Sequence, residues 1–325
     1  MIYTVTFNPA IDCVMHADDV SIGSINRSRT QEFYFGGKGV NVSYVLSYLG
    51  RPSIAWGFVA GWTGEALEDA LARDGIASGF VHLPAGNTRV NVKLKGHVEG
   101  AGERETAVNA PGPPVDGASL EAFFDQLADV RAGDVLVLSG GIPSGMDETV
   151  YARIMKRVAA SSADVVVDAT GDLLMNTLPL HPLLVKPNDE EIAEIMGAGF
   201  DASSESDLER GARRMHDLGA RNVLISRGGD GALLIDEAGE LHRADAHAGE
   251  LVNSVGAGDS TVAGFVEGTL RALELGLSGS DAVEYAFHLA LACGSATAFS
   301  PGLAPIEKVR ELFSRAGYAQ GGSLS

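Results

Sequence analysis

Residues 253–264 read N-S-V-G-A-G-D-S-T-V-A-G and combine a glycine turn with the start of a helix. Gly256, Ala257 and Gly258 predict a small-residue turn whose backbone N–H groups can point outward unhindered. Apolar residues at helical spacing then predict a helix that begins near residue 261. A glycine turn that opens a helix is a ready anion site, because unpaired N–H groups and the positive end of the helix dipole converge there.

Asp259 lies within this predicted anion site. A carboxylate beside a phosphate-sized anion is repulsive unless it has chemistry to perform. One interpretation is that Asp259 takes a proton from a hydroxyl group that then attacks a phosphoryl group. The other is that Asp259 only caps the helix, as aspartate often does. The stretch by itself leaves both interpretations open.

The composition narrows the class of protein. The chain has 325 residues, 45% of them hydrophobic, and a net charge of -19. This length allows one large α/β domain, or a large domain with a small one. The excess of acidic residues argues against partners such as nucleic acid or an anionic membrane surface, since both need clustered cations. If the substrate is an anion, the cationic side chains that contact it must therefore be concentrated at its binding site.

Other classes are excluded by what the sequence lacks. Cys13 and Cys293 are its only cysteines, so no disulfide framework or cysteine-rich metal site can form. The first residues read as a strand, without the pattern of a signal peptide, and no apolar run reaches transmembrane length. We expect a cytoplasmic protein.

Strand and helix patterns alternate along most of the chain. This alternation predicts an α/β fold with a mainly parallel, doubly wound sheet and helices on both faces. Predicted strands lie at 2–7, 53–59, 134–139, 164–168, 183–186, 222–226, 232–236 and 241–243, and predicted helices follow the 35–42 stretch and lie at 63–73, 117–129, 147–160, 189–197, 205–218, 260–275, 280–298 and 305–315.

Two segments interrupt the alternation and predict a small β-sheet lid. Residues 88–95 (T-R-V-N-V-K-L-K) alternate strictly, with Arg89, Asn91, Lys93 and Lys95 on one face and Val90, Val92 and Leu94 on the other. An ordinary solvated hairpin is the alternative. The predicted core comprises 1–12, 36–86 and 110–316, the lid 13–35 and 87–109, and a flexible Gly/Ser-rich tail 317–325.

Polar or glycine-rich turns follow several of the predicted strands. Parallel strands present their carboxyl ends at one edge of a sheet, so these turns predict a single cleft. Asp12 follows the first strand, although it could be an ordinary turn aspartate. The stretch F-G-G-K-G-V-N-V (35–42) adds Lys38 and Asn41 ahead of a helix, and it is not a Walker loop. The other turns are at Ser139–Gly140, Lys186–Glu191, Arg227–Gly231 and Val255–Asp259.

The whole ordered set of motifs resembles the ribokinase (PfkB) family of carbohydrate kinases. The residues that carry the resemblance are 35–42, V-K-P-N-D-E-E (185–191), S-R-G-G-D-G-A (226–232) and S-V-G-A-G-D-S (254–260). It covers nearly the full length and implies a ribokinase-like fold, with ATP and Mg²⁺ as cofactors.

The resemblance also implies a role for each motif. Asp259 corresponds to the catalytic base, and Gly256, Ala257 and Gly258 to a backbone anion hole for the transferring phosphoryl group. Substrate hydroxyls would be held by Asp12, Gly37 and Asn41, with Ser139 at the same edge. ATP would contact Lys186, Asn188, Ser226, Gly228 and Gly231, and Glu191 of the N-x-x-E motif would organise Mg²⁺.

Three features narrow the resemblance to the 1-phosphofructokinase and tagatose-6-phosphate kinase subgroup. They are the N-P-A-x-D start at 8–12, Lys38 within G-G-K-G, and T-R-x-N-x-K at 88–93. A phosphosugar needs positive charge, for which Arg27, Lys38, Arg89 and Lys93 are the candidates. Fructose 1-phosphate is the favoured substrate. Tagatose 6-phosphate remains the alternative, because Asn26-Arg27 fits its pattern and the two sugars present similar ends.

Other functions fit the sequence less well. A dinucleotide oxidoreductase would need a glycine at Thr261 and a following strand with an acidic residue. A non-catalytic sugar-phosphate-binding regulator on the same fold would not need Asp259 and the intact glycine turn. A kinase of plain sugars or nucleosides should show fewer basic residues near the sugar. We also expect a homodimer through the lid, which would bury Val90, Val92 and Leu94.

Overall fold

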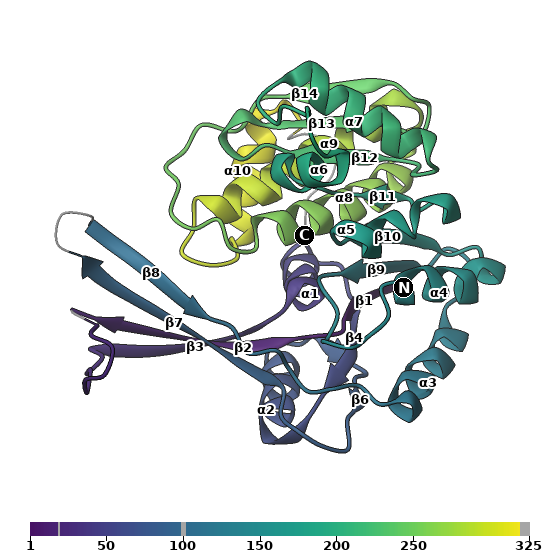
Figure 1. Cartoon of the computed structure of the whole chain (residues 1–325). Helices are drawn as coiled ribbons and strands as arrows, with labels where there is room; N and C mark the ends of the chain where they lie inside the picture. Colours follow the sequence, from purple (N-terminus) through teal and green to yellow (C-terminus); the bar gives the residue numbers. More distant parts are fainter. Residues whose placement is uncertain (19, 99–101, 319–325) are drawn as a thin grey trace.

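Strand β1 (Ile2–Thr6) is an interior strand of the main sheet, and all five of its residues are buried. It pairs in parallel with β4 (Ile54–Val59) on one side and with β9 (Val135–Ser139) on the other. The computed structural model, which describes residues 1–18, 20–98 and 102–318, shows this sheet as the centre of an α/β core (Figure 1).

The main sheet confirms the predicted, mainly parallel architecture. Its strand order is β14-β13-β12-β11-β10-β9-β1-β4-β5, and β6 (Val81–His82) pairs with β4. The strands from β12 to β5 run in parallel, whereas β13 and β14 continue the sheet in antiparallel fashion. The remaining bounds are β5 (Ala77–Ser78), β10 (Asp164–Asp168), β11 (Leu184–Val185), β12 (Val223–Ser226), β13 (Ala232–Ile235) and β14 (Leu241–Ala244).

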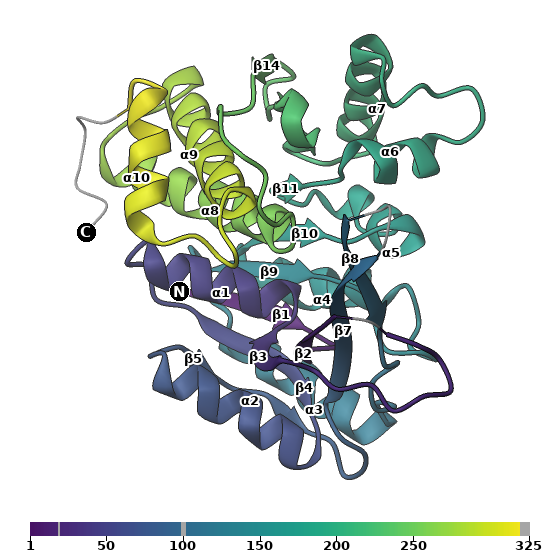
Figure 2. The same ribbon diagram turned by 90° about the vertical axis from the view of Figure 1, so that its left-hand side faces the viewer.

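Helices cover both faces of this sheet, as a doubly wound fold requires (Figure 2). Alternate residues of β1 enter different cores, since Ile2 packs with one helical layer and Tyr3 and Val5 pack with the other. One layer contains α1 (Lys38–Tyr48), α2 (Gly61–Arg73), α8 (Ala257–Glu274), α9 (Ser280–Ala298) and α10 (Ile306–Arg315). The other contains α3 (Gly117–Gln126), α4 (Val150–Val158), α5 (Gly171–Met175), α6 (Asp189–Met196) and α7 (Glu205–Asp217).

A second sheet projects from the core and corresponds to the predicted lid (Figure 1). Its order is β3-β2-β7-β8, and β2 and β7 are parallel neighbours while the outer pairs are antiparallel. The bounds are β2 (Ala10–Ala17), β3 (Thr30–Gly36), β7 (Arg89–Val98) and β8 (Gly102–Val108).

The register of the second sheet sorts its side chains onto two faces. Asp12 pairs with Tyr34 and Asn91, and Val14 pairs with Glu32 and Lys93. These residues share one face, because side chains alternate along a strand. The other face carries Cys13, Phe33, Val92 and Val108 in one row. The predicted alternation of polar and apolar residues over 88–95 is therefore confirmed.

Three sequence-based positions need correction. Asp12 lies inside β2, not in a turn after β1, because β1 ends at Thr6 and the new strand already begins at Ala10. Helix α8 begins at Ala257, four residues before the expected start, since Gly256 alone adopts the left-handed conformation (φ 82°) and caps the helix. Arg27, expected on the small sheet, lies in the loop between β2 and β3 and is exposed.

The predicted tail is described only in part. Its second residue, Tyr318, stacks on Phe313 with ring centroids 5.4 Å apart. Residues 319–325 lie outside the described residues. Within the described ranges, no helix is long and apolar enough to span a membrane.

Candidate active site

Two neighbouring cavities lie between the main sheet and the second sheet. The smaller, about 400 Å³, is lined by residues from nearly every predicted motif. The larger, about 650 Å³, extends along the polar face of the second sheet. Both include Asp12, Gly37, Asn41 and Gly256 in their walls. The smaller cavity is also lined by Lys38, Arg89, Asn91, Lys186, Asn188, Glu191, Ser226, Gly258 and Asp259.

Asp259 lies in the first turn of α8 and is only 5% exposed. Its Oδ2 accepts a hydrogen bond of 2.7 Å from Nδ2 of Asn41, which lies in the first turn of α1. Helix α8 has no side-chain cap, and its N-cap residue is Gly256. The carboxylate of Asp259 is thus directed into the cavity and held there by a second helix, and it does not serve as the cap.

Two lysines and a second aspartate lie beside Asp259. Asp168, the last residue of β10, is 1% exposed and pairs with Lys38 Nζ at 3.2 Å and with Lys186 Nζ at 3.4 Å. Lys186 itself is 4% exposed. Two cations therefore offset the two carboxylates, which makes burial of Asp168, Asp259 and Lys186 tolerable, while Lys38 stays partly exposed.

The pKa values of the two carboxyl groups, Asp259 and Asp168, are shifted in opposite directions. Burial raises the pKa of Asp259 to about 6, and the charge of Asp168 adds to this effect against the opposing influence of Asn41 and both lysines. Burial also acts to raise the pKa of Asp168, but Lys186 and Lys38 outweigh it, and the net shift is downward. Carboxyl groups with separated pKa values can take different roles, and Asp259 is the stronger base of the two.

The glycine turn brings the backbone close to Lys186. A Cβ atom on Gly258 would lie 3.2 Å from Lys186 Nζ, so only glycine leaves the ammonium group its full space. The N–H of Ala257 already donates to the carbonyl of Ser254 at 3.2 Å. Of the three residues predicted to form the backbone anion hole, Gly256 and Gly258 line the smaller cavity, while Ala257 does not.

The N-x-x-E motif forms the start of α6. Asn188 Oδ1 accepts from the N–H of Glu191, and Glu191 Oε2 accepts from the N–H of Asn188. This reciprocal arrangement is a capping box, which explains the three-residue spacing in structural terms. Both residues also line the smaller cavity, together with Ser226. The backbones of Ser226 and Asn188 pair through an isolated parallel β-bridge.

On the lid side, Lys93 and Arg89 have partners within the chain. Lys93 Nζ pairs with Asp12 Oδ2 at 3.0 Å, and Asn91 donates to Asp12 Oδ1 at 2.8 Å. Arg89 donates to the carbonyls of Asn8 and Ala110 at 3.2 and 3.4 Å. Arg89 still faces the smaller cavity and Lys93 the larger one. These contacts hold the cations in place at the mouth of the site.

The chain is similar over nearly its full length to proteins of a known family. The family model described as pfkB family carbohydrate kinase matches residues 5–308. A 1-phosphofructokinase of Bacillus subtilis is 39% identical over 96% of this chain and 97% of its own length. A D-tagatose-1-phosphate kinase of Bacillus licheniformis is 33% identical over 97% and 98%.

The chain belongs to the pfkB family of carbohydrate kinases.

A solved structure supports the fold of this pfkB kinase. Phosphofructokinase-2 of Escherichia coli, in complex with fructose-6-phosphate, superposes with a TM-score of 0.85 over 97% of this chain and 99% of that chain, at 24% identity. The predicted ribokinase-like architecture is therefore confirmed. The family model and the Bacillus subtilis relative confirm the expectation of a phosphosugar kinase that uses ATP.

Some residues predicted for the kinase site do not line either cavity. Ser139 is fully buried beside Asp168, because the register of β9 and β10 places the two residues opposite each other. Gly228 and Gly231 lie in the turn between β12 and β13, and Arg27 lies in the exposed β2–β3 loop. Among the described residues proposed for the site, these four and Ala257 lie outside the cavity walls.

Sequence reasoning missed Asp168. It ends the apolar run D-V-V-V-D (164–168), and its carboxylate joins Lys38 to Lys186. A signal was present, because a charged residue at the carboxyl end of a buried parallel strand points to the ligand edge of the sheet. The pairing of Lys38 with Asp168 also places Lys38 beside Asp259, the predicted base, in addition to its predicted place near the sugar.

Proposed function

We propose that this kinase transfers the γ-phosphoryl group of ATP to the C6 hydroxyl of fructose 1-phosphate, which gives fructose 1,6-bisphosphate. The observation that carries the proposal is one cavity in which a buried carboxylate, Asp259, faces Lys38, Lys186 and Arg89. The name of the Bacillus subtilis relative supports the choice of sugar.

Asp259 acts as the general base in this proposal. Its carboxylate accepts the proton of the C6 hydroxyl while the new P–O bond forms, and the bond from the γ-phosphorus to the bridging oxygen breaks. A pKa of about 6 leaves Asp259 ionised at neutral pH and makes it a stronger base than an ordinary aspartate. Asn41 holds the accepting carboxylate in place through its 2.7 Å hydrogen bond.

Charge on the transferring group is met by Lys186, Lys38 and the amide of Gly258. Lys186 is buried and fixed by Asp168, so its positive charge is preorganised and acts in a region of low dielectric. The second sheet covers the larger cavity with its polar face, where Lys93 and Asp12 meet the sugar. Closure of this sheet over the substrates would exclude water and so prevent hydrolysis of ATP.

Mg²⁺ fits the start of α6. The ion prefers one or two carboxylates together with water and phosphate oxygens, and Glu191 offers such a carboxylate in the cavity wall. The capping box engages Oε2 of Glu191, so Oε1 is the oxygen that would face the ion or its waters. When bound, Mg²⁺ neutralises negative charge on the phosphates of ATP.

D-tagatose 1-phosphate is the second candidate substrate, since two of the similar relatives carry that name. Like fructose 1-phosphate, it carries its phosphate on C1, and the two sugars differ only in the configuration at C4. Tagatose 6-phosphate, the alternative raised by the sequence, places the phosphate at the opposite end. A non-catalytic regulator on this fold is the alternative of another class.

A coupled ATP assay distinguishes these possibilities. We expect kcat/KM for fructose 1-phosphate to exceed that for tagatose 1-phosphate, tagatose 6-phosphate and fructose 6-phosphate by at least about tenfold, which corresponds to roughly 1.4 kcal/mol of transition-state discrimination. A preparation of Asp259→Ala made in the same way controls for contaminating kinases. A higher value for any other sugar would reassign the substrate, and no turnover of any of them would favour a regulator.

We further propose a homodimer that forms through the outer face of the lid. Phe33 and Val108 on that face are 53% and 61% exposed, and Val92 between them is half-buried. An apolar row of this kind in a short sheet is suited to pairing with a second copy. A cytoplasmic location also stays a prediction.

A further inference from the structure

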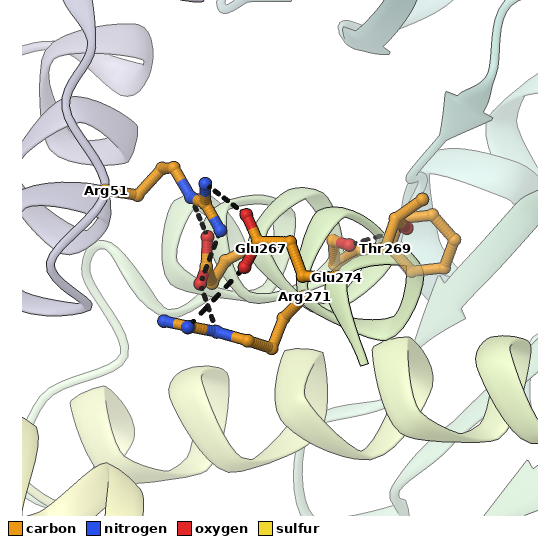
Figure 3. Close-up of polar contacts among 6 residues, drawn as sticks. Arg51, Glu267, Thr269, Arg271 and Glu274 are labelled. Carbon is orange, nitrogen blue, oxygen red and sulfur yellow. Dashed lines mark hydrogen bonds and ion pairs between the residues drawn. The ribbon is translucent and has the colours of Figure 1, made fainter. Parts of the chain in front are cut away.

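An ionic cluster joins the C-terminal end of α1 to the C-terminal half of α8, outside the walls of both cavities. Glu267 of α8 is fully buried, yet its carboxylate accepts from Arg51 Nε at 2.5 Å and from Arg51 Nη2 at 3.2 Å. Arg271 Nε reaches the same carboxylate at 3.2 Å, and Glu274 accepts from Arg51 Nη1 at 2.8 Å. Figure 3 shows Arg51 reaching across to Glu267 and Glu274 of α8, while Arg271 approaches the same two carboxylates from within α8.

Arg51 is rigidly attached to α1. The helix ends at Tyr48, Gly50 has φ 80°, and the N–H of Arg51 donates to the carbonyl of Leu46 at 2.8 Å, while Gly50 N–H donates to Ser47. This pattern is a Schellman motif, which fixes the residue after the glycine relative to the last turn. Arg51 therefore moves with α1, and the cluster connects α1 directly to α8.

The two helices run in the same direction and make polar contacts with each other at two levels. At their first turns, Asn41 of α1 donates to Asp259 of α8. Further along both helices, Arg51 forms an ion pair with Glu267. Between these two polar contacts the interface is apolar and includes Val45 and Val262. Apolar surfaces tolerate small sliding movements, whereas a bidentate arginine–carboxylate pair fixes position along the axis.

The opposite side of α8 is already closely packed. A Cβ atom on Gly264 would lie 2.7 Å from Ala290 Cα, and one on Gly268 would lie 2.5 Å from Ala286 Cα, both in α9. Helix α8 is thus in backbone contact with α9 on one side. The ionic cluster supplies the corresponding constraint toward α1.

We propose that Glu267 and Arg51 are positioning residues for phosphoryl transfer. By fixing the axial register of α1 against α8, they hold Asn41 and Lys38 at the distance from Asp259 that the reaction needs. None of its four residues lines either cavity, so the cluster acts through the α1–α8 interface. A misplacement of about 1 Å at the reacting atoms can reduce turnover strongly, so a remote contact that sets the register matters for rate.

The test compares two buried carboxylates. Glu267→Gln keeps size and removes the charge that both arginines share. Asp236→Asn is the matched control, because Asp236 is 5% exposed and pairs with the buried His242 at 2.9 Å, and neither residue lines either cavity. We expect both variants to lose thermal stability. Only Glu267→Gln should lose kcat, by at least about fivefold, with KM for ATP changed less than twofold.

Two further variants keep the proposal falsifiable if Glu267→Gln folds poorly. Arg51→Lys retains the charge but loses the bidentate geometry, and it should also lower kcat. In an Asn41→Ala background, Glu267→Gln should cost less than in the wild type, because both changes act on the same contact. Wild-type kcat in Arg51→Lys, a kcat in Glu267→Gln within twofold of wild type, or strictly additive losses would overturn the positioning role.

These measurements rest on the proposed function only for the choice of sugar. The assay uses whichever phosphosugar the wild-type enzyme turns over. Failure of the proposed substrate would appear as absent wild-type turnover of fructose 1-phosphate. Failure of the positioning role would appear as variants that match the wild type on the substrate it does accept.

Discussion

The burial of Asp259 costs stability, which its proposed role as general base would explain. This residue is buried beside Asp168, and the fold compensates with Asn41, Lys38 and Lys186. A surface aspartate would be easier to accommodate but would be a weaker base. The raised pKa therefore fits a role in proton transfer better than a role in the helix cap.

Asp259→Ala should reduce kcat by on the order of 10²–10⁴, because general-base catalysis typically contributes that much. The sugar should still bind, since Asp12, Asn91 and the lid cations are unchanged. Steady-state kinetics give kcat, and isothermal titration calorimetry gives the affinity for the sugar. Near-normal turnover in this variant would remove Asp259 from the role of base.

Asp259→Asn should make the protein more stable at neutral pH. The folded-state pKa of Asp259 is raised to about 6, whereas an unfolded aspartate titrates near 3.9. The folded form thus holds its proton more tightly, and stability falls as pH rises from about 4 to 6. Above this window the full cost applies, on the order of 1–3 kcal/mol, and asparagine avoids it.

Urea denaturation of the Asp259→Asn variant and of the wild type, at pH 8 and pH 5, measures this effect. The gain should be clearly larger at pH 8 than at pH 5. An equal gain at both values would mean that the ionisation of Asp259 is not its source.

Arg89→Ala should raise KM for the phosphosugar by about tenfold or more and change KM for ATP much less. Arg89 lies in the wall of the smaller cavity, and loss of a hydrogen bond to a charged group costs about 1.5–3 kcal/mol. Arg27→Ala is the matched control, since Arg27 lies in the exposed loop and should have little effect. Equal changes in both KM values for Arg89→Ala would count against a phosphate contact.

At the scale of elements, α8 and α9 depend on small residues where they cross. Gly268 lies opposite Ala286, and a methyl group there would come within 2.5 Å of backbone. This close approach places α8, and with it Asp259, against the rest of the helical layer. Gly256 is needed for a different reason, because its φ of 82° turns the chain into the helix.

Gly268→Ala should therefore destabilise the protein by about 1–3 kcal/mol, the usual cost of overpacking a tight contact. Gly117→Ala is the control, because no atom lies within 4 Å of its Cβ position in α3. That variant should be neutral or slightly stabilising, as alanine favours helices. Thermal denaturation of both variants checks the prediction, and equal midpoints would show that α8 and α9 can separate without cost.

At the scale of the whole molecule, the second sheet has two different faces. Its polar face lines the larger cavity, and its other face carries the exposed Phe33 and Val108. If two copies pair through the second face, Phe33→Glu should convert a dimer into a monomer by placing a charge in the apolar interface. Light scattering coupled to size-exclusion chromatography measures this mass. A wild-type monomer would refute the lid-mediated dimer, as would a dimer unaffected by the substitution.

The sequence by itself determined the fold class, the second sheet and most of the predicted site residues that line the two cavities. The strand and helix periods are local properties, so they predicted the parallel core and the alternating face of residues 88–95. The glycine turns and strand ends identified four candidates, Asp259, Asn41, Lys186 and Glu191, because ligands of an α/β sheet bind beyond the carboxyl ends of its strands.

Only the tertiary structure decided which charges meet. Asp168 entered the site because the sheet order brings β10 next to β11, and Lys38 joins it from α1 across more than a hundred residues. The proposal that Asp259 is a base also depends on its burial and on the hydrogen bond from Asn41. The link from Arg51 to Glu267 spans 216 positions. Electrostatic partners at such separations depend on packing in three dimensions, which no local pattern of residues encodes.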